Sequence, residues 1–232
     1  MQGNIAEIFS SVQGEGKYAG CRQLFLRFVG WNLPCRVETV AGSQEFREIP
    51  NTVTSQEVRG ILDEFLASAT HQALAITGGE PLLYADFIAE LCKNLPVKVM
   101  LETNGTLHEE LEKVLQVVDI ISMDIKFPSA VGRSLWENHR RFMELAKERD
   151  LYIKLVVTGD LPGEEFAKAL ALIKETAPNA PVVLQPVTPV KNVQPADPKR
   201  MLELQQFALE FLQAPPENVR VIPQTHRMMN LL

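Results

Sequence analysis

Polar side chains that can bind a ligand or move a proton follow most of the apolar runs in this sequence. Seven of them lie at or just after the end of such a run: Thr77, Glu80, Glu102, Asp124, Lys126, Gln185 and His226. If the runs are parallel strands, their carboxyl ends meet at one edge, where α/β proteins place ligand sites. Groups such as Glu80, Lys126 and His226 can act there as general acids or bases. We therefore expect a ligand site at that edge.

The segment Thr77–Pro81, of sequence Thr-Gly-Gly-Glu-Pro, has the composition of a turn that contacts a ligand. Its two glycines allow the backbone to approach a ligand closely, and Glu80 beside them can accept hydrogen bonds from a ligand amine. The segment lacks the Gly-Lys-Ser/Thr ending of a phosphate-binding loop. Further along, Asp124 and Lys126 are two residues apart, so on a strand they share one face and can form an ion pair or contact a common ligand.

The elements that must position these residues are strands that alternate with helices, a pattern that predicts parallel pairing and right-handed crossovers. Successive Val, Ile and Leu residues without alternation are typical of strands covered on both faces. Seven runs show this pattern: Leu24–Phe28, Ala73–Thr77, Val97–Leu101, Ile120–Ile125, Leu151–Val157, Val182–Gln185 and Val219–Ile222. Ile5–Phe9 is predicted as an additional edge strand. Helical periodicity is present within residues 58–65, 87–91, 107–118, 142–146, 166–173 and 204–211.

These elements predict one domain over residues 1–232, because no repeat, low-complexity segment or clear linker divides the chain. We expect a closed or partly closed α/β barrel, with a flat doubly wound sheet as the alternative. Residues 30–53 have no clear period and contain Gly, Pro, Asn and Ser. A long irregular segment inside a compact domain usually marks a functional loop.

The composition excludes several classes of protein. A hydrophobic fraction of 46% and a charged fraction of 22% exclude a disordered or fibrous chain. The formal net charge is −6, so we expect no binding to nucleic acid or to an anionic membrane. The sequence predicts no signal peptide and no membrane-spanning run, and three cysteines are too few for a disulfide framework. We therefore expect a cytoplasmic protein.

Short motifs occur in order through almost the whole chain. They are Glu7–Gly16, Leu26–Gly30, Asn32-Leu33, Thr77–Leu83, Glu102–Thr106, Asp124–Ser129, Leu184–Pro189 and Gln224–His226. Together they resemble the 7-carboxy-7-deazaguanine synthases, which are radical S-adenosylmethionine (SAM) enzymes of queuosine and other deazapurine pathways. The resemblance implies a partial (β/α) barrel, a homodimer, and the ring contraction of 6-carboxy-5,6,7,8-tetrahydropterin to 7-carboxy-7-deazaguanine with loss of ammonia.

The resemblance also implies cofactors and site residues. In the family a reduced [4Fe–4S] cluster cleaves SAM, the adenosyl radical removes a hydrogen from the pterin, and magnesium assists. By motif, the residues that would hold the pterin are Gln13, Gly14, Glu15, Arg27 and Thr77, with Arg27 on the pterin carboxylate. Those that would surround SAM are Gly79, Glu80, Asp124, Ile125, Lys126 and Gln185. Thr39 matches the threonine that contacts magnesium.

The cluster motif of the family, CxxxCxxC, is degenerate in this sequence. Residues 30–39 read Gly-Trp-Asn-Leu-Pro-Cys-Arg-Val-Glu-Thr, so Trp31 stands at the first cysteine and Cys35 at the second. Glu38-Thr39 replaces the third cysteine and the residues after it, with one position lost. Iron–sulfur clusters are held mainly by thiolates, and Cys21 and Cys92 are expected to be ordinary small residues. Cys35 is thus the sole remaining cysteine of the cluster type.

Three hypotheses remain open at this point. The chain is a degenerate family member that binds SAM, the pterin or a related purine without radical chemistry. Alternatively, it is an enzyme that performs non-radical chemistry in the inherited pocket. The third is a true synthase whose sequence has been altered.

Overall fold

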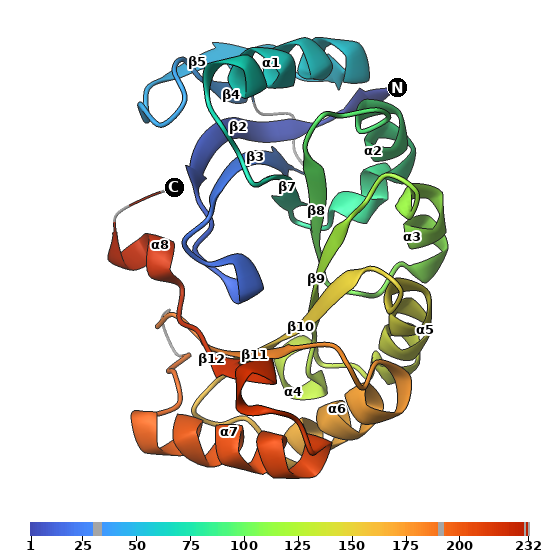
Figure 1. Ribbon diagram of the computed structural model, residues 1–232, viewed down its shortest axis with the longest axis vertical. Coiled ribbons are helices and arrows are strands. Elements are labelled where there is room, and N and C mark those ends of the chain that lie inside the picture. Colours follow the sequence, from blue (N-terminus) through green and yellow to red (C-terminus); the bar gives the residue numbers. More distant parts are fainter. Residues whose placement is uncertain (30–33, 190–192, 230, 232) are drawn as a thin grey trace.

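The computed structural model describes residues 1–29, 34–189, 193–229 and 231. Its main feature is a ten-stranded sheet, strongly curved, with the order β12-β11-β10-β9-β8-β7-β3-β2-β4-β5 (Figure 1). The strands are β2 (Ile5–Val12), β3 (Arg22–Phe28), β4 (Cys35–Glu38), β5 (Phe46–Ile49), β7 (Ala73–Gly78), β8 (Lys98–Thr103), β9 (Ile120–Ile125), β10 (Asp150–Val157), β11 (Val182–Pro186) and β12 (Val219–Val221). Two short strands, β1 (Gln2–Gly3) and β6 (Val53–Thr54), pair separately.

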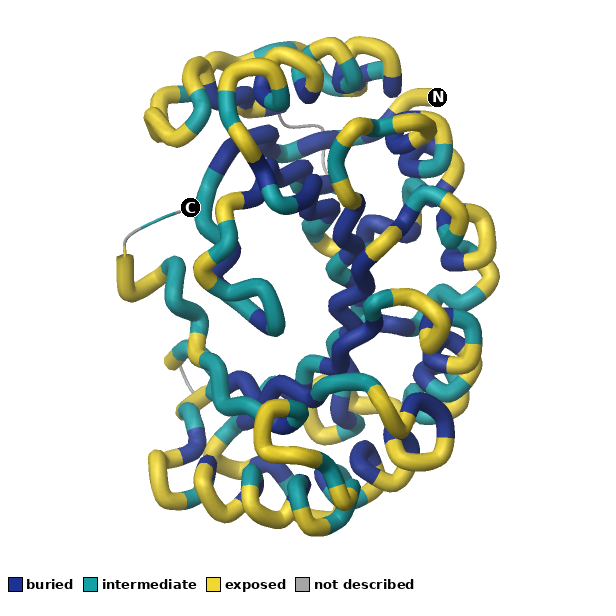
Figure 2. The backbone as a smooth tube through the Cα atoms, viewed as in Figure 1, coloured by how far each residue is buried: buried dark blue, intermediate teal, exposed yellow. Residues whose placement is uncertain are grey.

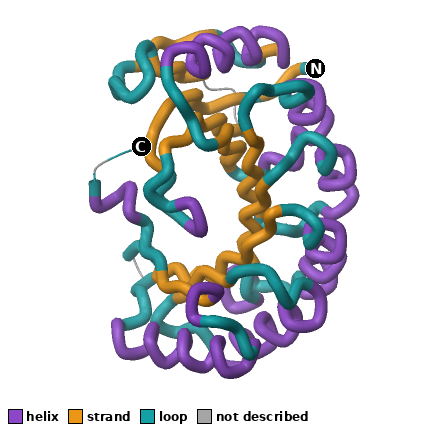
Figure 3. The backbone as a smooth tube through the Cα atoms, in the orientation of Figure 1, coloured by secondary structure: helices purple, strands orange, loops and turns teal. Residues whose placement is uncertain are grey.

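The long helices cover only the outer, convex side of this sheet, while the strands line its inner side (Figures 1 and 3). They are α1 (Ser55–Ser68), α2 (Ala85–Leu91), α3 (His108–Val114), α5 (Trp136–Ala146), α6 (Gly163–Thr176) and α7 (Pro198–Leu212). Short helices α4 (Pro128–Val131) and α8 (Thr225–Met228) and single turns at Gly16–Tyr18, Pro81–Tyr84 and Pro216–Asn218 complete the described elements. The predicted partial barrel is confirmed. The doubly wound alternative is not, because it needs long helices on both faces.

Side chains alternate between the two faces of the sheet, and the pairing register fixes which residues share a face. The outer face packs on the helices in the main hydrophobic core, and the buried strands of this layer are seen in Figure 2. The inner face carries two small apolar clusters, which are Ala73, Met100, Ile120, Tyr152 and Val183, and Phe9, Phe25 and Ala75. Beyond these clusters, toward the carboxyl ends of the parallel strands, the same inner face becomes polar.

The open side of the curved sheet is occupied by the segment between β2 and β3, residues 13–21, which we call the inner loop. This loop folds back into the interior (Figure 1). Gly16 lies so close to Tyr152 of β10 that an added Cβ would be 2.4 Å from the phenol oxygen. Lys17 forms an ion pair with Asp150 at 2.5 Å. From the other end of the chain, the amide of Thr225 donates to the carbonyl of Gly14 at 2.9 Å.

In the described residues β12 and β5 are the two edges of the sheet and do not pair, so of the two predicted forms of the barrel the partly closed one is present. Two other fold predictions were wrong. Strand β2 is not an edge strand, because it pairs with β3 on one side and β4 on the other. Region 30–53 is not irregular throughout, since it contains the antiparallel pair β4–β5. Strands of four residues with one exposed face are too short to produce a clear sequence period.

None of the helices within the described ranges is long and apolar enough to cross a membrane.

Candidate functional site

Two adjacent cavities lie on the polar part of the inner face. The first has a volume of about 130 Å³ and is lined by Val12, Gln13, Gly14, Glu15, Phe25, Arg27, Thr77, Glu102 and His226. The second has a volume of about 160 Å³ and is lined by Thr77, Gly78, Gly79, Glu102, Thr103, Asn104, Ser122, Asp124, Lys126 and Lys154. The cavities share Thr77 and Glu102, so they form one continuous polar surface. A larger hollow, at the amino-terminal ends of β10 and β11, contains none of the motif residues.

The structure brings together most of the residues to which the resemblance assigns a ligand. All five of the pterin residues line the first cavity. Of the six SAM residues, Gly79, Asp124 and Lys126 line the second cavity, whereas Glu80, Ile125 and Gln185 do not. Ile125 is buried in the core between the sheet and the helices. The ligand contacts of all these residues stay predictions.

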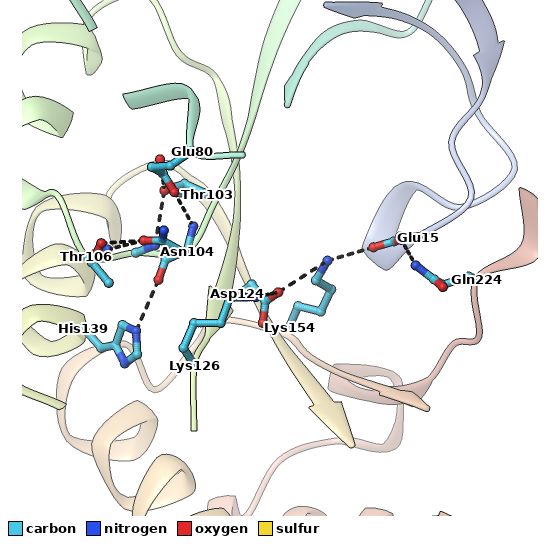
Figure 4. A network of polar contacts seen from close by, with 11 residues as sticks. Glu15, Glu80, Thr103, Asn104, Thr106, Asp124, Lys126, His139, Lys154 and Gln224 are labelled. Carbon is cyan, nitrogen blue, oxygen red and sulfur yellow. Dashed lines mark hydrogen bonds and ion pairs between the residues drawn. The ribbon is translucent and has the colours of Figure 1, made fainter. Parts of the chain in front are cut away.

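A chain of charged side chains crosses both cavities (Figure 4). The ammonium nitrogen of Lys154 lies 2.7 Å from Oε2 of Glu15 and 3.8 Å from Oδ2 of Asp124. Oδ2 of Asp124 is also 2.7 Å from the ammonium of Lys126. Burial by itself lowers the pKa of Lys154, but the carboxylates of Asp124 and Glu15, together with that of Glu102, outweigh it and raise the pKa above its ordinary value. Lys154 therefore remains protonated.

Glu15 is held from two sides. Its Oε2 accepts from Lys154 and its Oε1 accepts from the side-chain amide of Gln224, so the end of the chain is fastened to the inner loop. Burial raises the pKa of Glu15, but Lys154 and Gln224 more than compensate, so the carboxyl has a pKa below its usual value of 4.5. Glu15 is a carboxylate at neutral pH.

Glu102 lines both cavities, and its pKa is shifted in the opposite direction from that of Glu15. Its Oε1 accepts from the side-chain amide of Gln13 at 2.8 Å, and the same amide donates to Gln23 at 2.9 Å. Burial and the nearby Glu15 raise the pKa of Glu102, while Lys154 acts in the opposite direction. The site thus contains one carboxyl with a lowered pKa beside one with a raised pKa, and such pairs are common where proton donors and acceptors are needed.

Glu80 does not point its carboxylate at an open cavity. Oε1 accepts from the hydroxyl of Thr103 at 2.8 Å, and Oε2 accepts from the backbone amide of Asn104 at 2.9 Å. Glu80 thus joins the turn after β7 to the loop after β8 (Figure 4). The neighbouring Gly78 has φ +133°, and a Cβ there would be 2.3 Å from the carbonyl oxygen of Phe28, so this turn requires glycine.

Arg27 approaches the first cavity from β3. Its guanidinium is 2.6 Å from Oε2 of Glu7 and lies over the ring of Phe9, 5.2 Å from its centroid. Oε1 of the same Glu7 binds Arg36 of β4 at 2.7 Å. Two guanidinium groups thus flank one carboxylate, but only Arg27 lines the first cavity.

Two buried oxygens on the inner face have no hydrogen-bond partner among the described residues. They are Oδ1 of Asp124 and Oε1 of Gln185. Buried polar atoms are normally hydrogen-bonded. Asp124 lines the second cavity, so its unpartnered oxygen is suited to a donor on a bound ligand, whereas Gln185 lines neither cavity.

The three cysteines do not gather at this site. Cys35 alternates with Arg36 on β4 and is fully buried in the core on the helix side of the sheet, where burial raises the pKa of its thiol to about 11. Cys92 is buried at the end of α2, and Cys21 is the last residue of the inner loop. Across the described ranges, which include all three cysteines, no group of three or more His, Cys, Asp or Glu residues could hold a metal ion. Trp31 and the rest of 30–33 lie outside the described residues.

The residues that follow Cys35 have structural contacts of their own. The buried carboxylate of Glu38 accepts three backbone amides, from Ser10 at 2.8 Å, Gly42 at 3.0 Å and Gln44 at 2.8 Å. The exposed Thr39 donates its hydroxyl to the carbonyl of Glu45 at 3.3 Å. Thr39 lines a separate cavity between the β4–β5 hairpin and α1. Its contact with magnesium stays a prediction.

Sequence reasoning gave no site role to Lys154 or Ser122. Lys154 is the single charge within the apolar run Leu151–Val157, and a buried charge must be paired. That interruption was the available signal. Glu102 and His226 are among the polar residues expected at the ligand edge, but the resemblance assigns neither of them to a ligand. The structure places both on the first cavity.

Comparisons with known proteins agree with this architecture. Residues 35–175 match the family model described as the Radical SAM superfamily. The chain is 39% identical to a 7-carboxy-7-deazaguanine synthase of Geobacter sulfurreducens, over 98% of this chain and 97% of that protein. It is 32% identical to one of Methanothermobacter thermautotrophicus, over 100% of this chain and 98% of that protein.

Solved structures with a similar fold are more distant in sequence. A radical SAM methyltransferase from Sphaerobacter thermophilus aligns with a TM-score of 0.57 at 13% identity, covering 94% of this chain and 77% of that one. Streptococcus suis SuiB bound to S-adenosylmethionine aligns with a TM-score of 0.54 at 15% identity, covering 78% and 45%. These two similarities show the fold alone. With the family model and the full-length relatives, the chain belongs to the radical SAM superfamily and, within it, to the 7-carboxy-7-deazaguanine synthase family.

Proposed function

We propose that this chain binds a pterin- or deazapurine-like ligand in the first cavity and SAM in the second, and that it does not perform the cluster-dependent ring contraction. One observation carries the proposal. The five residues assigned to the pterin converge on one cavity, while the sole cysteine of the cluster motif faces the opposite side of the sheet. The ligand-binding framework of the family is thus retained without the thiolates that its chemistry needs.

The first cavity matches the chemistry of a carboxylated pterin. The pyrimidine edge of a pterin presents N–H donors, and the carboxyls of Glu15 and Glu102 are acceptors for them. Arg27 supplies a planar cation that suits the ligand's carboxylate. A guanidinium has five N–H donors, so the bond from Arg27 to Glu7 leaves further donors for the ligand.

The second cavity matches the polar groups of SAM. Gly79 would have no heavy atom within 4 Å of an added Cβ, so a ligand can approach its backbone closely. Oδ1 of Asp124 can accept from a ribose hydroxyl or from the ligand's ammonium group, and Lys126 can donate to its carboxylate. Gln185 on the same face offers a second unpartnered acceptor.

The donor set does not fit a [4Fe–4S] cluster, so no step is derived through one. The family's cluster requires three thiolates in one loop, and this chain has one there. Cys35 is a buried neutral thiol in the helix-side core. Glu38 could replace a cysteine only by giving up three backbone hydrogen bonds, and its hard oxygen atoms suit a cluster poorly. A homodimer, a cytoplasmic location and a magnesium contact at Thr39 belong to the same proposal as expectations from the sequence.

Anaerobic thermal unfolding of the iron-free chain tests the binding proposal. A ligand that binds only the native state raises the unfolding temperature in a concentration-dependent manner. We expect this rise with 6-carboxytetrahydropterin and with SAM, each added alone. The control is a tetrahydropterin that lacks the carboxylate, and we expect no rise with it. The absence of a shift with both ligands would overturn the proposal. Formation of 7-carboxy-7-deazaguanine would instead support an active synthase.

A further inference from the structure

We propose that Lys154 is a positioning residue that joins the two cavities: its ammonium group holds the carboxylates of Glu15 and Asp124 together, so that a ligand in one cavity alters the affinity of the other. No motif of the family resemblance contains this lysine. The part of the proposal that concerns ligands rests on the proposed function. The part that concerns the two carboxylates rests on the geometry of the chain alone.

The position of Lys154 follows from the strand register. On β10 it is paired with Asp124 of β9 and with Val183 of β11, so all three side chains share the inner face. Its side chain is only 13% exposed. Lys154 lines the second cavity, yet its nearest carboxylate, Glu15, belongs to the inner loop and lines the first. It therefore bridges two segments that are 139 residues apart in sequence.

A buried ammonium group is costly unless carboxylates compensate it. Lys154 has two within ion-pair distance, Glu15 at 2.7 Å and Asp124 at 3.8 Å, and Glu102 adds a weaker interaction. The shorter contact is the stronger, and the longer one is available if Glu15 finds another donor. The lysine thus has two alternative partners, one on each cavity.

This arrangement couples ligand binding. A ligand that donates N–H groups to Glu15 competes with Lys154 for that carboxylate. The ammonium then interacts more strongly with Asp124, which lines the second cavity and whose other oxygen is unpartnered among the described residues. A change of affinity at one site that depends on occupancy of another is a coupling free energy, and it must be reciprocal.

A double-mutant cycle in the ligand-free protein, the mutant box, tests whether Lys154 interacts with both carboxylates. Glu15→Gln, Asp124→Asn and their combination are made in the natural background and with Lys154→Met, and the shift of the urea midpoint is measured. With Lys154 present, we expect the combined variant to lose more than the sum of the single losses, because the ammonium loses both partners. With Lys154→Met, the losses should add. Additivity in both backgrounds, or non-additivity in both, would overturn the proposal.

Two further variants test whether the non-additivity depends on the charge at position 154. Lys154→Arg keeps the charge and should restore the non-additivity, whereas Lys199→Met, at an 89% exposed side chain on α7, should leave it unchanged. If the combined variant does not fold, the NMR chemical shift of the Lys154 ammonium nitrogen replaces the urea measurement as the test of the proposal. It should shift in each single variant, and a shift in only one of them would contradict the joint hold on both carboxylates.

Anaerobic calorimetry tests the coupling of ligands. The affinity for SAM is measured with and without saturating 6-carboxytetrahydropterin. We expect a change of at least about threefold in the natural chain and with Lys154→Arg, and none with Lys154→Met. An equal change with Lys154→Met would overturn the proposal. If neither compound binds, the proposed function fails, while the mutant box still decides whether Lys154 joins the carboxylates.

Discussion

The inner-face cavities and the β4–β5 hairpin both contain residues that match motifs of the family, but the side chains in the two regions make different kinds of contact. Around the cavities, the polar side chains face one another and form a charged network across β9, β10 and the inner loop. In the hairpin, Cys35 faces the hydrophobic core and Glu38 is bound to backbone amides. Polar groups that could contact a ligand line the first region, whereas Cys35 and Glu38 of the second contact other groups of the protein.

The difference shows that the cavities and the hairpin are built largely from different contacts. The cavities are formed by the inner loop and by the ends of strands from β2 to β10, whereas the hairpin lies at the edge of the sheet beyond β2. The hairpin has contacts of its own at the Glu38 carboxylate and at the guanidinium of Arg36 over the ring of Phe46 at 4.2 Å, and it is joined to the first cavity through Glu7, which binds both Arg36 and Arg27. The loss of cluster ligands that we propose for the hairpin region therefore need not abolish the cavities.

The largest expected effect is on the hairpin. Glu38→Ala leaves three backbone amides, of which that of Ser10 is buried, without their acceptor, so we expect a loss of about 3 kcal/mol in the free energy of unfolding. Urea denaturation measures this loss, and Glu48→Ala, at an exposed position of β5, is the control. The affinity for 6-carboxytetrahydropterin should be unchanged in the folded variant. A strong loss of affinity would show that the two regions are not independent.

The second effect concerns the loop after β8, which borders the second cavity. His139 of α5 is fully buried and its Nε2 contacts the carbonyl of Asn104 at 3.2 Å. Burial lowers its pKa from 6.5 to about 4. The unfolded chain therefore binds a proton first as the pH falls, so stability is complete above pH 6.5 and declines by roughly 3 kcal/mol down to about pH 4. Denaturation at several pH values should show a smaller decline in His139→Gln, and an unchanged decline would contradict this assignment.

The third effect separates the two guanidinium groups on Glu7. Arg27→Gln removes a charged partner from the first cavity, and we expect the affinity for 6-carboxytetrahydropterin to fall about 30-fold, or about 2 kcal/mol. Arg36→Gln breaks an equivalent ion pair outside that cavity and should change the affinity by less than about threefold. Calorimetry measures both. Equal losses would place the ligand elsewhere or show that Glu7, not Arg27, controls the cavity.

The smallest effect is on Cys35. Replacing it with alanine removes one buried sulfur atom from the core, so Cys35→Ala should cost about 1 kcal/mol of stability. Cys92→Ala, at another buried thiol, is the matched control. The amount of iron that each protein retains should be the same. A selective loss of iron in Cys35→Ala would mean that this thiol binds metal after all.

The strands of the parallel sheet could be predicted to within one or two residues, because buried Val, Ile and Leu runs leave little ambiguity. The strands Ile120–Ile125 and Val182–Pro186 are examples. The hairpin could not, because Cys35–Glu38 and Phe46–Ile49 are short and partly exposed. The interior position of β2 depends on its pairing with β4, so the same omission made it look like an edge.

The candidate site was predictable where polar residues follow strands and was not where they lie within them. Gly79, Asp124 and Lys126 come at strand ends, and each lines the second cavity. Lys154 lies in the middle of an apolar run, and its role depends on Glu15, a partner that only the folded inner loop brings within 2.7 Å. Glu80 was expected to face a ligand amine, but the sequence could not reveal its contacts with Thr103 and Asn104.

The most direct test of the central claim is the iron and sulfide content of the chain after anaerobic reconstitution. The structure has one cluster-type cysteine, turned into the core, so we expect no stable four-iron cluster. The Trp31→Cys variant should behave in the same way, because a third thiolate is still missing. A full complement of four irons and four sulfides per natural chain, with the visible absorbance of a [4Fe–4S] cluster, would contradict the account.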